Sequence, residues 1–72
     1  MNIMQEKAMN KIRDNAPDGA MSYQDYRQLM SWQFRLNKQE SKKLLAELQE
    51  MGLVQLGNHG FKLLGVYGGT ER

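Results

Sequence analysis

Hydrophobic residues recur along the chain in three helical stripes, followed by a short stretch of strand-like alternation. The first stripe consists of Met1, Met4, Ala8 and Ile12, with Met9 and Ala16 beside it. Its spacing of three to four residues predicts an amphipathic helix over residues 1–14. Asn, Pro, Asp and Gly then occur within residues 15–19, so the helix is expected to end in a turn there. Residues 20–21 are too few to predict an element, although a brief extended segment would fit.

A second helix is predicted to follow Ser22, whose side chain can accept a hydrogen bond from the backbone at the helix start. Its hydrophobic stripe consists of Tyr23, Tyr26, Met30 and Phe34, with Leu29 on the flank. Trp32 lies off this stripe. Either Trp32 is a surface aromatic residue, or the helix distorts near Ser31.

The strongest pattern is a third helix that starts after a turn at Arg35-Leu36. Asn37 and Glu40 have the spacing at which each side chain satisfies the other's backbone N–H group, so Asn37 is predicted to cap the helix. Its buried stripe is expected to consist of Leu44, Leu48 and Met51, with Leu45 at the edge. Gly52 follows the stripe and predicts that the helix stops near Met51.

A β-hairpin is predicted directly after this helix. If the chain reverses at Asn58-His59, Leu56 faces Phe61 and Val54 faces Leu63, so the apolar residues share one face of the hairpin. Asn58 tolerates a positive φ, which a tight hairpin turn needs; a four-residue loop is the alternative. Val66-Tyr67 are the last residues expected to pack, which predicts one domain over residues 1–67 and a disordered tail over residues 68–72.

Composition excludes several classes of function. The chain has 72 residues and no cysteine, which leaves room for one small domain and rules out disulfides, thiolate nucleophiles and cysteine-based zinc sites. No residues pair a nucleophile with a base, so we expect no enzyme activity, no cofactor and no bound metal. No apolar run approaches the roughly 20 residues that span a bilayer, so a cytoplasmic protein without membrane contact is expected. The formal charge of +2 is only a weak indication of a nucleic-acid partner.

The predicted order of elements resembles that of a winged helix-turn-helix DNA-binding domain. The resemblance is carried by LLAELQEMGLVQLGNHGFKLL at residues 44–64, which resembles the third helix and wing of many bacterial and archaeal regulators. SYQDYRQLM at residues 22–30 resembles the start of their second helix. The resemblance implies an α+β fold with three helices and a C-terminal two-stranded wing.

The resemblance also implies a function and a site. In such domains the third helix enters the DNA major groove and the wing touches the backbone or minor groove. We therefore expect sequence-specific binding of double-stranded DNA and a role in transcriptional regulation. The expected contact residues are Arg35, Lys38, Gln39, Lys42, Lys43 and Ala46 around the third helix, and Asn58, His59 and Lys62 in the wing. Gln39 suits an adenine edge, and the lysines suit phosphates or guanine.

Two alternatives remain open at the level of sequence. A solvated helix face is commonly rich in Lys, Gln and Glu without binding DNA. A winged helix can also serve as a protein-interaction module, with Trp32 and the methionines as contacts. The chain has no long additional helix for dimerisation, so we expect a monomer or a weak homodimer. His59 is expected to be a residue at the tip of the turn rather than a metal ligand.

Overall fold

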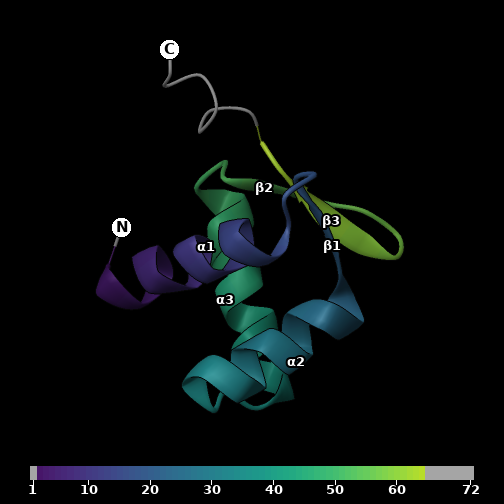
Figure 1. The fold of residues 1–72 in the computed structure, drawn as a ribbon. Coiled ribbons are helices and arrows are strands. Elements are labelled where there is room, and N and C mark those ends of the chain that lie inside the picture. The colour runs from purple at the N-terminus through teal and green to yellow at the C-terminus, as the bar shows by residue number, and fades with distance from the viewer. Residues whose placement is uncertain (1, 65–72) are drawn as a thin grey trace.

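Three helices and one small antiparallel sheet make up the fold (Figure 1). The computed structural model describes residues 2–64. In chain order the elements are α1 (Ile3–Asn15), β1 (Ala20–Ser22), α2 (Tyr23–Phe34), α3 (Lys38–Glu50), β2 (Val54–Leu56) and β3 (Gly60–Leu63). The predicted α+β class is confirmed, and the layout is compatible with a winged helix. The predicted packing of Val66-Tyr67 and the predicted tail lie outside the described residues.

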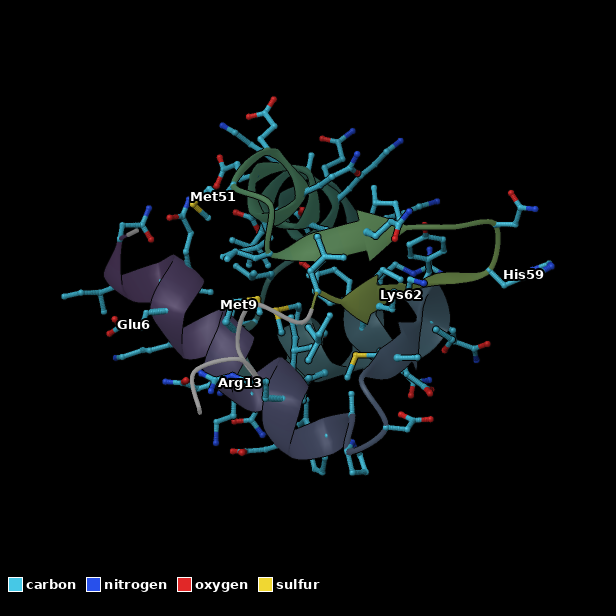
Figure 2. The ribbon with its side chains drawn as sticks, turned by 90° about the horizontal axis from the view of Figure 1, so that it is seen from above. Glu6, Met9, Arg13, Met51, His59 and Lys62 are labelled. Atoms are coloured by element: carbon cyan, nitrogen blue, oxygen red, sulfur yellow. The ribbon has the colours of Figure 1, made fainter. Side chains whose placement is uncertain are left out.

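Helix α1 begins two residues later than its hydrophobic stripe suggested, because Asn2 caps it. The Asn2 side chain accepts a hydrogen bond from Gln5 N–H at 2.7 Å, and the Gln5 side chain accepts one from Asn2 N–H at 2.9 Å. The helix buries Ala8, Met9 and Ile12 against the other elements. Figure 2 shows Met9 on the inner side of the helix, toward the centre of the molecule. The predicted stripe is therefore confirmed over its described part.

The turn between α2 and α3 is made without a glycine. Arg35 adopts the left-handed conformation, with φ 56° and ψ 36°, which costs a non-glycine residue about 1 kcal/mol or more. Arg35 N–H donates to the Ser31 carbonyl at 3.0 Å, and Leu36 N–H donates to the Met30 carbonyl at 3.3 Å. Trp32 is 83% exposed on a regular helix, so the surface-aromatic interpretation holds.

Helix α3 has the predicted capping box, with Asn37 and Glu40 exchanging hydrogen bonds of 2.8 and 2.9 Å. Leu44, Leu45 and Leu48 are buried. The prediction that Met51 continues this stripe is wrong, because the helix ends at Glu50 and Met51, its C-cap, is 38% exposed.

Gly52 ends α3 in the predicted way. It has a φ of 79°, its N–H donates to the Gln49 carbonyl at 2.9 Å, and Leu53 N–H donates to the Leu48 carbonyl at 3.0 Å. These two bonds satisfy carbonyls that the helix end leaves free.

Replacing Gly52 by valine is therefore expected to destabilise the protein by about 1–2 kcal/mol, although a Cβ would have open space around it, because a β-branched residue is strained at positive φ. Urea denaturation measures the change. Gly52→Asn is the matched control and should cost less, since asparagine tolerates this conformation. Equal losses for the two variants would contradict the assignment.

The hairpin has the predicted register. Val54 pairs with Leu63, Gln55 with Lys62, and Leu56 with Phe61. The expected positive φ at Asn58 is wrong: within residues 2–64 only Gly19, Arg35 and Gly52 have one. A tertiary contact accounts for the different turn conformation, because the start of α2 is hydrogen-bonded to this loop. Tyr23 OH donates to the Gly57 carbonyl at 2.5 Å, and Tyr23 N–H donates to the His59 carbonyl at 3.2 Å.

The predicted two-stranded wing is in fact part of a three-stranded sheet. Its strand order is β1-β3-β2, so β3 is central. Residues Ala20, Met21 and Ser22 pair with Lys62, Phe61 and Gly60, respectively. A three-residue strand has little stability of its own, and β1 forms because β3 offers a free edge. The residues near β1 in the sequence do not indicate this pairing, because its partner strand lies far along the chain.

Candidate nucleic-acid interface

All nine predicted contact residues are exposed, but the fold distributes them over several surfaces. Arg35 lies in the turn after α2, and Lys38, Gln39, Lys42, Lys43 and Ala46 lie on α3. Asn58 and His59 form the hairpin tip, and Lys62 lies in β3. Their positions relative to α1 and α2 decide which of them can act together.

Lys38 and Lys42 lie on the edge of α3 that faces α2. Together with Ala46 they line a groove of about 420 Å³ between α2, α3 and strand β2. The groove reaches Arg27 of α2 on its far side and Leu56 of β2 at its end. We call this space the α2–α3 groove.

Arg27 is a basic residue that sequence reasoning did not include. It lines the α2–α3 groove with Lys38 and Lys42, and it also lines a second hollow with Ser31, Trp32 and Arg35. Arg27 therefore joins Arg35 to the lysines of α3. We call Arg27, Arg35, Lys38 and Lys42 the basic strip. A helical wheel of the second helix would have indicated Arg27, because it follows Tyr23 by one turn.

Lys43 lies on the opposite edge of α3, toward α1. It lines a hollow with Glu40 and Glu47, and with Met4 of α1. Glu47 also accepts a hydrogen bond from Gln5 Nε2 at 3.1 Å. Two carboxylates beside Lys43 reduce its attraction for phosphate, so Lys43 does not belong to the basic strip. Gln39 is exposed on the outward face of α3 between these two edges.

The hairpin tip is attached to the start of α2 by the two Tyr23 hydrogen bonds described above. Figure 2 shows His59 at the far end of the hairpin. Lys62 has a different orientation. Side chains alternate along a strand, and its neighbour Phe61 is buried in the core, so Lys62 points from the sheet face that is turned away from the helices. Lys62 and the basic strip therefore occupy different surfaces.

Tyr26 fixes the position of α3 against α2. Its OH donates to the Ser41 carbonyl at 2.6 Å, and its ring meets Phe61 edge-on with the centroids 5.5 Å apart. Burial raises the pKa of the Tyr26 phenol well above its usual range, and the negative charge of Glu47 raises it further. Tyr26 is therefore a neutral hydrogen-bond donor at physiological pH, and it sets the spacing at which the basic strip crosses from one helix to the other.

Other kinds of site have little support within residues 2–64. This part of the chain contains no cluster of three or more potential metal ligands among His, Asp and Glu. Its helices are also too short and too polar to cross a bilayer. Comparison of the chain with protein-family models, curated proteins and solved structures gave no match. The family resemblance therefore rests on the residues and on the arrangement of the elements.

Proposed function

We propose that the chain binds double-stranded DNA through α3 and the hairpin tip, and that it acts in transcriptional regulation. The observation that carries this proposal is the basic strip, which extends from α2 and the turn after it to the exposed side of α3, in a layout compatible with a winged helix. Cations on a helix and beside it can neutralise phosphates while the helix lies in the major groove.

The geometry suggests separate roles for these residues. Arg27, Lys38 and Lys42 border the side of α3 and suit phosphates on one flank of the groove. Gln39 projects outward between the edges of the helix, where an amide can pair with the N6 and N7 atoms of adenine. His59 extends from the molecule at the hairpin tip (Figure 2). Its exposed neighbour Asn58 and His59 both suit the DNA backbone.

The proposal predicts different effects for neighbouring lysines. Lys42→Ala is expected to weaken binding to a mixed-sequence duplex and to lower the salt slope of binding by about one, because one phosphate contact is lost. Lys43→Ala should have a smaller effect, since Glu40 and Glu47 lie beside it. Fluorescence anisotropy between about 50 and 200 mM salt measures both quantities.

The control is Lys7→Ala, which removes an exposed cation from α1. It should leave both the affinity and the salt slope nearly unchanged. If Lys7→Ala and Lys42→Ala weakened duplex binding equally, the attraction would be diffuse charge attraction, and this would contradict DNA recognition by α3.

A protein-interaction module is the second candidate, and the exposure of Trp32 favours it. Tryptophan is rare on free surfaces and common in protein interfaces, and this one is 83% exposed. Binding through Trp32 would respond little to salt, whereas DNA binding falls steeply with it. The same titration therefore separates the two candidates.

A further inference from the structure

The α2–α3 groove has the chemistry of a small-ligand site. Its floor is formed by side chains that are almost fully buried, Leu45 at 5% and Tyr26 at 1% exposure. Leu56 forms one end and remains 38% exposed, although it lies on the apolar face of the hairpin. A volume of about 420 Å³ lies within the range usual for ligand pockets.

The charges around this floor have one sign. Arg27, Lys38 and Lys42 line the groove, and no carboxylate does so within residues 2–64. The two tyrosines that line the groove offer no free hydroxyl proton, because Tyr23 OH donates to the Gly57 carbonyl and Tyr26 OH donates to the Ser41 carbonyl. The lining side chains that can still donate a hydrogen bond to a ligand are therefore the three cations. Charge complementarity selects an anion.

We propose that the α2–α3 groove binds a small amphipathic anion, an aryl or short acyl carboxylate, with its apolar body over Leu45 and Leu56 and its carboxylate at the three cations. A DNA phosphate would contact the cations but would leave the apolar floor uncovered, since the sugar-phosphate backbone has no apolar body.

The ligand would also regulate the function proposed above. Lys38 and Lys42 belong both to the groove and to the basic strip, so a carboxylate held by them competes with phosphate. Saturating ligand is expected to weaken duplex binding. This consequence rests on the proposed DNA binding, whereas occupation of the groove itself does not.

The test is a titration of the full chain with 2-naphthoate, followed by amide NMR shifts, with neutral 2-naphthamide as the matched probe. Naphthoate is expected to shift Tyr23, Ala46 and Leu56 saturably and to leave Trp32, which lies outside the groove, in place. Naphthamide should bind about two- to five-fold more weakly than naphthoate, as expected for the loss of an exposed ion pair. Lys42→Gln should weaken naphthoate binding to a similar extent and leave naphthamide binding unchanged.

A blocking variant separates the groove from non-specific binding. Ala46→Phe places a ring over the groove from an exposed helix position and should abolish binding, whereas Gln24→Phe adds the same ring to the exposed surface of α2 and should not. Thermal melts establish that both variants are folded. Any one of three results would overturn the proposal. The two probes could bind with equal affinity, the NMR shifts could centre on Trp32, or a short duplex could shift the groove residues while naphthoate does not. Absence of duplex binding with an intact naphthoate response would overturn the proposed function alone.

Discussion

Replacing Gly60 by alanine is expected to destabilise the protein by about 3 kcal/mol or more. Gly60 lies in central strand β3 directly opposite Ser22 of β1. A Cβ at Gly60 would lie 2.8 Å from Ser22 Cα and still closer to the Met21 carbonyl oxygen. Both obstructing groups are backbone, so no side chain can rotate away, and β1 must separate from β3. Calorimetry should show a melting temperature lower by roughly 15 °C.

Gly57→Ala provides the matched control in the same hairpin. Its Cβ would lie 3.3 Å from the Gly60 carbonyl oxygen, a contact that a shift of a few tenths of an ångström relieves. We expect a loss below about 1 kcal/mol. If Gly57→Ala cost as much as Gly60→Ala, the close approach of β1 to β3 would not be the cause.

The second large effect concerns alkaline pH. The folded protein keeps the Tyr26 proton because burial raises the phenol pKa, whereas an unfolded tyrosine releases it near pH 10. Stability from this group is therefore fully present below about pH 10 and declines above it, by up to about 1.4 kcal/mol for each pH unit. Urea denaturation at a series of pH values from neutral to about 12 measures the decline.

Tyr26→Phe separates this effect from the other groups that titrate at high pH. The variant lacks the hydrogen bond to the Ser41 carbonyl, so it should be less stable by about 1 kcal/mol at neutral pH. Its stability should then fall less steeply above pH 10 than that of the unaltered protein. Parallel curves for the two proteins would show that Tyr26 does not govern the alkaline transition.

Local signals in the sequence were sufficient to predict the helices and the hairpin register. Asn37, Glu40 and Gly52 act through neighbours within a few residues, so their roles can be read from spacing alone. The Asn2 cap uses the same signal as Asn37 and was also readable. Arg35 was correctly placed in a turn, but its left-handed backbone conformation has no signature in the sequence.

Features that depend on distant partners could not be predicted. Strand β1 forms on the edge of β3, and the hairpin turn takes its conformation from Tyr23 rather than from Asn58. The candidate site shows the same limit. A helical wheel places Lys42 and Lys43 together on the exposed face of α3, but it does not contain α1 or α2, whose positions separate the two lysines and bring Arg27 into the basic strip.

The central position of β3 also bears on the order of folding. Strand β1 meets it across about 40 residues of chain, whereas β2 meets it through a short hairpin. If α2 and α3 form first, the flexible part of this longer loop is shorter and less entropy is lost when it closes, which favours late pairing of β1. We therefore expect β1 to join after the folding transition state. Kinetic φ-values near zero at Met21 and high values in α3 are expected, and a high value at Met21 would reverse this order.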